Sequence, residues 1–338
     1  MIEIRQDPPK DEWAIIAPVR GDRPFDFSAE AEEDRVGREN CPFCPGNEDK
    51  TPPEIYAVRG GENKDKSNWK VRVFPNKFPA LDREGTTSMI EGDIFRSIGG
   101  FGFHEVIAET PEHDVNLEDL EKEKIELIID TYLERQKELA AEPEINYVSI
   151  FRNKGKRAGA SLAHPHSQIL ATTFVPRIPE TEYGQTESFK RQTGDCFYCR
   201  LVEAEKQEEE RVILENSGFI AISPFWARTP FETHIIPKKH ESDFSQVSRA
   251  GVTKFAEALK GTLTALRTEL GDFPYNYSIH TTPVAELERY GHLKESYHWH
   301  LEIFPRLTTP AGFEWGSGNF INIVSPEDAA KRLRASLE

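Results

Sequence analysis

The stretch His164-Pro165-His166-Ser167-Gln168-Ile169 decides the fold, because a second version, His298-Trp299-His300-Leu301-Glu302-Ile303, follows near the other end of the chain. A cysteine pair comes before each stretch: Cys41-x-x-Cys44 before the first and Cys196-x-x-Cys199 before the second. Landmarks that recur in the same order indicate an internal duplication. The sequence therefore predicts two related units.

Each unit combines one long helix with antiparallel strands. Apolar residues recur at helical spacing from Leu117 to Leu133, after a capping residue at Asn116, and again from Val252 to Leu266 before Gly271. Segments rich in aromatic and β-branched residues predict strands, at 147–151, 168–174, 275–280 and 299–305. We predict an α+β fold of duplicated units, with antiparallel sheets each crossed by a long helix.

The length of the chain suits this duplication. Its 338 residues are enough for two units, and we place the first in residues 1–180 and the second in residues 185–338. The acidic stretch 176–193, which contains proline and glycine, is predicted to separate them.

Charge and hydropathy exclude two classes of partner. Asp and Glu outnumber Lys and Arg by 58 to 42, and the net charge of -16 repels nucleic acid and anionic membranes. The sequence has no apolar run of about 18 residues and no apolar N-terminal leader. We expect a cytoplasmic protein with no nucleic-acid and no membrane partner. The net negative charge does not exclude a small phosphate ligand, because a local basic pocket attracts an anion within about 8 Å, the distance over which salt screens charges.

Two histidines follow each cysteine pair at corresponding points. Paired cysteines in a protein that is not exported indicate metal binding or redox chemistry. A redox dithiol or chance cysteines stay alternatives, but the duplication favours metal. The predicted ligands form two Cys2His2 sets that suit tetrahedral zinc: Cys41, Cys44, His113 and His164, and Cys196, Cys199, His240 and His298. Iron stays open, notably at the second site, because spacing reports geometry better than the element.

Alternate residues of an extended strand share a face, so His164, His166 and Gln168 line up on one side. If metal holds His164, then His166 keeps one imidazole nitrogen free as a nucleophile, and Gln168 can donate to a phosphoryl oxygen. The preceding loop, Asn153 to Ser161, is basic and Gly-rich, so its backbone N–H groups can hold a phosphate. The alternative is a solvated polar strand face, which the adjacent loop disfavours.

These motifs resemble the galactose-1-phosphate uridylyltransferase family of the histidine-triad superfamily. The resemblance spans nearly the whole chain, and its motifs are Cys41-Pro-Phe-Cys44-Pro-Gly-Asn-Glu, Val-Phe-Pro-Asn76-Lys-Phe, Ser161-Leu-Ala-His164-Pro-His166-Ser-Gln168 and Pro230-Phe-Glu-Thr-His-Ile-Ile-Pro. It implies duplicated histidine-triad-like units, a homodimer, and a ping-pong reaction in which His166 takes a nucleoside monophosphate from a nucleotide sugar. It also implies substrate-binding roles, which fall on Arg20, Arg23, Asn76, Asn153, Gly159 and Ser161.

The resemblance leaves the substrate open. The leading hypothesis is UMP transfer between a UDP-hexose and a hexose 1-phosphate, with nucleotide sugar and sugar 1-phosphate as partners. Lys77 and the tail 312–321 depart from the enterobacterial pattern, and the tail is more similar to plant-type relatives. The alternative is therefore an ADP-sugar phosphorylase or another adenylyltransferase of the same fold. A catalytically inactive nucleotide-binding or zinc-containing scaffold is a third possibility, which an intact His166 disfavours.

His300 and Glu302 occupy in the second unit the places of His166 and Gln168. A second active site is conceivable there, but no Gly-rich basic loop precedes it, so we interpret His300 as structural or as an alternative metal ligand. The remaining histidines are expected to be hydrogen-bonded structural or surface residues: His104, His234, His280 and His292.

Overall fold

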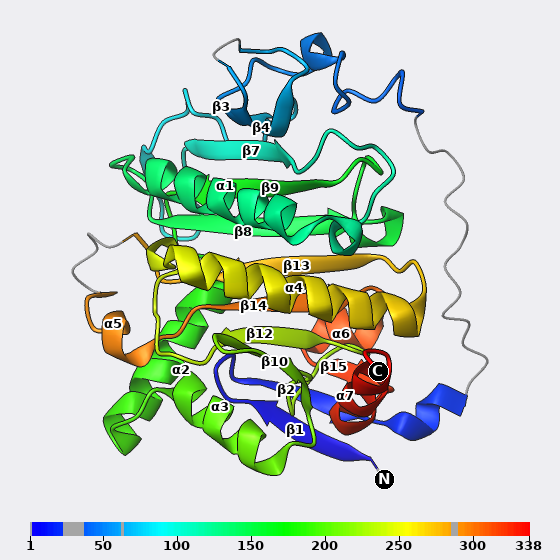
Figure 1. Cartoon of the computed structure of the whole chain (residues 1–338). Coiled ribbons are helices and arrows are strands. Elements are labelled where there is room, and N and C mark those ends of the chain that lie inside the picture. Colours follow the sequence, from blue (N-terminus) through cyan, green and yellow to red (C-terminus); the bar gives the residue numbers. More distant parts are fainter. Residues whose placement is uncertain (1, 23–36, 62–63, 285–289) are drawn as a thin grey trace.

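A computed structural model describes residues 2–22, 37–61, 64–284 and 290–338. It is an α+β structure built on one large sheet, in which all neighbouring strands are antiparallel. Figure 1 shows the long helices α1 and α4 lying across one face of this sheet. The strands, in spatial order, are β10 (Val212–Glu215), β11 (Phe219–Ile222), β12 (Thr233–Pro237), β14 (His300–Pro305), β13 (Tyr275–His280), β8 (Tyr147–Lys154), β9 (His166–Thr172), β7 (Gly102–Ala108), β4 (Trp69–Pro75) and β3 (Tyr56–Arg59).

The duplication is visible in the strand order. From the centre outward, the first half runs β8-β9-β7-β4-β3 and the second runs β13-β14-β12-β11-β10. The two central strands pair with each other, from Tyr275 opposite Lys154 to Ile279 opposite Ile150. The predicted α+β class and its antiparallel strands are confirmed, and the two predicted sheets are joined edge to edge into a single sheet of ten strands.

The two long helices bury the apolar stripes that the sequence shows. Helix α4 (Arg249–Leu270) begins after Ser248, whose side chain accepts from the Gly251 N–H, and ends at Gly271, which adopts φ +74°. Helix α1 (Lys122–Ala140) begins later than predicted. Asn116 precedes a separate 3-10 turn at Leu117–Asp119 instead of capping α1 itself.

The predicted separator is a helix. Residues Arg177–Thr193 form α2, which leads into α3 (Phe197–Glu208). Pro179 falls in the first turn, where a missing N–H costs nothing, so the proline does not break the helix. Tyr183 is buried on its inner face. The division at residues 180 and 185 stays a prediction.

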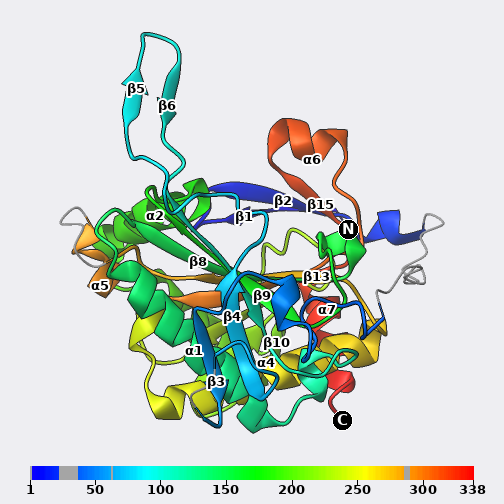
Figure 2. The ribbon, with the colours of Figure 1, turned by 90° about the horizontal axis from the view of Figure 1, so that it is seen from above.

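A smaller sheet lies on the other side of the large one. Strands β1 (Glu3–Asp7) and β2 (Glu12–Ile16) pair with each other, and β2 pairs in parallel with β15 (Phe320–Asn322). Figure 2 shows this sheet away from α1 and α4, on the side where a hairpin and α6 project. The remaining elements are β5 (Met89–Glu91) and β6 (Arg96–Ile98) of that hairpin, α5 (Leu293–Ser296), α6 (Gly312–Ser317) and α7 (Pro326–Ala335). Among the described residues, none of the helices has the length and apolar character of a membrane span.

One core lies between the large sheet and its two long helices, so its packing sets the stability of both halves. Leu263 of α4 is fully buried in it. We predict that Leu263→Ala lowers the free energy of unfolding by about 2–5 kcal/mol, through lost burial and the cavity left behind. Urea unfolding measures this. The matched control Leu337→Ala removes a side chain that is 42% exposed, and a loss as large as that of Leu263→Ala would contradict the assignment of the core.

Candidate functional site

The first cysteine pair and two histidines form one buried group. Ligand atoms of Cys41, Cys44, His113 and His164 all lie within 4.8 Å of one another. Cys44 Sγ is 3.1 Å from His113 Nδ1 and 3.5 Å from His164 Nδ1. The Nε2–H of His164 donates to the Thr110 carbonyl at 2.8 Å, which orients Nδ1 toward the thiols. Burial lowers the pKa of His164 to about 4, so the ring is neutral, as a metal ligand must be.

The second predicted set also comes together. Cys199 Sγ lies 3.5 Å from His240 Nδ1 and 3.7 Å from His298 Nδ1, and Cys196 Sγ lies 3.9 Å from His298 Nδ1. Cys196 caps α3 and Cys199 lies in its first turn, which places both thiols at one helix end. The Nε2–H of His240 donates to the Lys294 carbonyl at 2.9 Å. Both groups have the donors of a tetrahedral zinc site.

His166 opens β9 immediately beside the first group. Its Nδ1–H donates to the His164 carbonyl at 2.8 Å, so the lone pair lies on Nε2. Burial lowers the pKa of His166 below its ordinary value, although the His164 carbonyl acts in the opposite direction. The imidazole is therefore neutral at pH 7. The ring of Phe43 packs against it with centroids 5.3 Å apart, which limits its rotation.

The orientation of the Gln168 amide follows from a chain of hydrogen bonds. The backbone N–H of Ala80 donates to His104 Nδ1 at 3.1 Å, so the proton of His104 lies on Nε2. That Nε2–H donates to Gln168 Oε1 at 2.8 Å. Asn76 Nδ2 lies 3.4 Å from the same oxygen, and Asn76 Oδ1 accepts from the Phe78 N–H. These contacts hold the Gln168 amide with its oxygen toward His104 and Asn76.

Sequence reasoning treated His104 as structural and missed its contact with Gln168. The signal was present only in part. The stretch Phe103-His104-Glu105-Val106-Ile107 was not among the predicted strands, although its aromatic and β-branched residues are typical of one. The contact itself follows from the pairing of β7 with β9, which the sequence does not state.

The Gly-rich loop lies at the end of β8. Gly155 and Gly159 adopt φ +82° and +84°, a region that residues with a Cβ rarely occupy, so the loop needs glycine at both positions. Asn153 Oδ1 accepts from Asn276 Nδ2 at 2.7 Å, and the same nitrogen donates to the Ala158 carbonyl at 2.8 Å. Ser161 is exposed where the loop enters the His164–Gln168 stretch. The second half of the chain therefore supports the loop of the first.

Arg20, one of the two arginines predicted near the substrate, does not join this group within one chain. Arg20 lies in a 3-10 turn, Pro18–Asp22, beside the small sheet, where Ala17 N–H donates to the Asn322 carbonyl. The small sheet lies against the second half of the molecule, away from β9 (Figure 1). Arg23 lies outside the described residues.

A buried polar network lies behind His166. Arg152 Nε binds both carboxylate oxygens of Glu109, at 3.1 and 3.0 Å. The Tyr132 hydroxyl lies 3.2 Å from Glu109, 2.8 Å from Ser167 Oγ and 2.7 Å from the Tyr277 hydroxyl. These contacts link β9, the strand that His166 begins, to α1 through Tyr132 and on to β13 through Tyr277.

Comparisons with known proteins agree with this architecture. Models of the N-terminal and C-terminal domains of galactose-1-phosphate uridyl transferase match residues 2–176 and 182–310. An ADP-glucose phosphorylase of Arabidopsis thaliana is 38% identical over 98% of this chain and 92% of its own. A galactose-1-phosphate uridylyltransferase of Thermotoga maritima is 32% identical over 99% of this chain and 98% of its own.

A solved structure of the Arabidopsis enzyme with bound ADP-glucose superposes with a TM-score of 0.83, at 36% identity and 99% coverage of both chains. A uridylyltransferase structure gives a TM-score of 0.75 at 32% identity, over 100% of this chain and 98% of the other. The chain belongs to the galactose-1-phosphate uridyl transferase family, whose enzymes transfer nucleotidyl groups. The family expected from the sequence is thereby confirmed.

Proposed function

We propose that the chain transfers an adenylyl group from an ADP-sugar to phosphate, by way of a nucleotidyl intermediate on His166. The observation that carries the proposal is a neutral imidazole whose Nδ1–H is bound to the His164 carbonyl, with its lone pair on Nε2 beside a fixed Gln168 amide. The choice of base and acceptor rests on the similarity to the Arabidopsis ADP-glucose phosphorylase. Adenylyl transfer from an ADP-sugar was the alternative hypothesis from the sequence, and this similarity favours it over UMP transfer.

In the first step, the His166 Nε2 lone pair attacks the α-phosphorus of the nucleotide sugar. The bond from that phosphorus to the bridging oxygen breaks, and the oxygen leaves with the sugar 1-phosphate. In the second step, an oxygen of the acceptor phosphate attacks the same phosphorus, the P–N bond breaks, and the electron pair returns to Nε2. No general base is needed, because the acceptor is already an anion. The Gln168 NH2 and the loop from Asn153 through Gly159 to Ser161 would hold the phosphoryl oxygens.

The intermediate gives a direct prediction. With base-labelled ADP-glucose and no acceptor, the wild-type protein should carry acid-labile, base-stable label, and His166→Asn should carry none. The control His292→Asn changes a histidine whose side chain is 38% exposed and should keep the label. Mass spectrometry of the labelled peptide locates the adduct. Equal labelling of the His166→Asn variant would refute the nucleophile.

The second candidate is UMP transfer between a UDP-hexose and a hexose 1-phosphate, the leading hypothesis from the sequence. It is favoured by the Thermotoga uridylyltransferase, which aligns over nearly the full length of both chains. The same labelling experiment with UDP-glucose separates the two candidates: label from UDP-glucose alone would replace adenylyl by uridylyl transfer.

We propose that the two Cys2His2 groups hold zinc, with iron as an alternative at the second. The sets are closed, with four protein donors each, so a bound metal would fix structure. Zinc would give His164, two residues before the nucleophile, a rigid anchor. A reducing compartment such as the cytoplasm would keep all four thiols available.

This proposal predicts about two zinc ions per chain by elemental analysis. Cys41→Ser and Cys196→Ser should each remove about one ion and lower the unfolding temperature, because metal binding free energy is folding free energy. Cys41→Ser should also lower the rate of adduct formation, since it loosens the anchor of His164, whereas Cys196→Ser should affect stability first. A metal-free preparation with full stability would contradict the zinc assignment.

We also propose a homodimer formed through the face that carries the β5–β6 hairpin and α6. Large apolar side chains are exposed there, with Ile94 at 83%, Phe95 at 85% and Trp315 at 79%. Both elements project on the same side of the molecule (Figure 2). We infer that a second copy of the chain covers these projecting apolar side chains.

Sedimentation equilibrium should therefore give twice the mass of the chain, and the double variant Ile94→Ser, Phe95→Ser should shift it toward the monomer. Leu337→Ser, also an exposed position, is the control and should leave the dimer intact. A wild-type protein that sediments as a monomer at micromolar concentration would contradict the proposal.

A further inference from the structure

The second unit contains a buried group where the first unit has its nucleophile. His300 Nδ1–H donates to the His298 carbonyl at 3.2 Å, the same bond that His166 makes in the first unit. Glu302 replaces Gln168, and it lies opposite His234 on β12 and Ser278 on β13. The two units thus share backbone geometry and differ in charge.

Four side chains of this group could together hold a cation. Ligand atoms of Glu182, His280, His300 and Glu302 all lie within 4.8 Å of one another, and all four residues are buried. His280 Nδ1 is 3.0 Å from Glu182 Oε1, and His280 Nε2 is 3.6 Å from Glu302 Oε2. The residues come from α2, β13 and β14, so three separate elements converge on one point.

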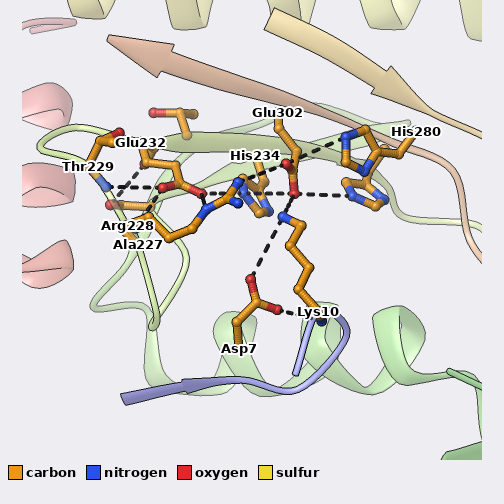
Figure 3. Close-up of polar contacts among 12 residues, drawn as sticks. Asp7, Lys10, Ala227, Arg228, Thr229, Glu232, His234, His280 and Glu302 are labelled. Carbon is orange, nitrogen blue, oxygen red and sulfur yellow. Dashed lines mark hydrogen bonds and ion pairs between the residues drawn. The ribbon is translucent and has the colours of Figure 1, made fainter. Parts of the chain in front are cut away.

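The chain itself supplies a cation to this point. Lys10, in the loop between β1 and β2, extends its ammonium group to Glu302 Oε1, with which it forms a hydrogen-bonded ion pair (Figure 3). Its Nζ also lies 3.8 Å from Glu182 Oε1 and 3.7 Å from Asp7 Oδ2. The Lys10 side chain is only 2% exposed, which is very rare for lysine without charged partners.

The position of Lys10 is itself held. Its backbone N–H donates to Asp7 Oδ1 at 3.1 Å, which closes the loop that carries it. The β1–β2 hairpin therefore fixes the backbone of Lys10, from which the side chain reaches Glu302.

The charge balance explains why a cation is needed. Asp7, Glu182, Glu232 and Glu302 bring four carboxylates to the buried group, which His234 also faces. Besides Lys10, the opposing charges come from Arg228, 3.4 Å from Glu302 and 3.6 Å from Glu232, and from His280, which contacts both Glu182 and Glu302. Figure 3 shows Lys10, Arg228 and His280 around the Glu302 carboxylate.

The neighbouring groups keep Glu302 ionised. Burial alone would raise the pKa of the Glu302 carboxyl, but Lys10 and His280 hold it well below its usual range. A buried, ionised carboxylate that loses its partner is strongly destabilising, so the site without Lys10 would need another positive charge.

We propose that Lys10 is the resident cation of a site formed by Glu182, His280, His300 and Glu302, that its ammonium takes the place of a divalent metal ion there, and that its removal opens the site to such an ion. The proposal is independent of the reaction assigned to His166. It also accounts for the inactivity expected of the second unit, because an ionised Glu302 and a bound lysine replace the neutral amide that faces a phosphate.

The test compares wild-type protein, Lys10→Ala and the control Lys122→Ala, which removes a lysine whose side chain is 36% exposed in a surface pair with Glu257. The probe is Mn²⁺, which prefers oxygen and nitrogen donors and binds poorly to the thiolate sites. Lys10→Ala should unfold at a lower temperature and bind about one Mn²⁺ more per chain than wild type, with the unfolding temperature rising on binding. Propylammonium, which carries the atoms removed by the substitution, should raise it as well.

Wild type and Lys122→Ala should show neither effect. A wild-type protein that binds the additional Mn²⁺ with Lys10 in place would overturn the proposal, and so would a folded Lys10→Ala that responds to neither probe.

If Lys10→Ala does not fold, a double-mutant cycle with Lys10→Met and Glu302→Gln replaces it. Removing the lysine and one carboxylate together should be less destabilising than removing the lysine alone, because the uncompensated charge is smaller. Additive losses across the cycle would show that Lys10 and Glu302 are not coupled and would overturn the proposal.

Discussion

The antiparallel pairing of β8 with β13 is the contact on which the rest of the molecule depends. It turns two half-sheets into one, and it places the side chains of β13 beneath the loop at the end of β8. Asn276 then holds Asn153 and the Ala158 carbonyl, while Tyr277 joins the hydroxyl of Tyr132 behind β9. The site of the first unit is therefore completed by residues of the second, and neither half presents it alone.

The two units share a backbone geometry but carry different charges at equivalent positions, Gln168 in the first and Glu302 in the second. In the first, Gln168 is neutral and its side-chain oxygen accepts from His104. In the second, Glu302 is charged and compensated from within by Lys10 and Arg228. A phosphate approaching the second site would meet buried carboxylates, so the acid Glu302, which stands where the first unit has the Gln168 amide, disfavours anion binding there.

Local patterns were sufficient for much of this fold. The spacing of apolar residues defined α4 up to Gly271, and the duplicated order of Cys and His predicted both four-residue groups. The helix α2 was missed because composition alone cannot show that a proline falls in a first turn. The partnership of Lys10 with Glu302 was also beyond the sequence, since residues 292 positions apart meet only once the sheets are assembled. Contacts of this kind carry no periodic signal, and the continuous sheet was missed for the same reason.

The small sheet ties the two ends of the described chain together. Strand β2 pairs with β15, and the Trp13 N–H donates to Asn319 Oδ1, a contact between residues 306 positions apart. During synthesis, β1 and β2 can pair with each other early, but the other edge of β2 waits for β15. Until β15 arrives, β2 has an unpaired edge, and such edges are where growing chains associate wrongly. The rate at which this protein reaches its final form is therefore expected to be set by its C-terminal residues, because long-range pairing is slow.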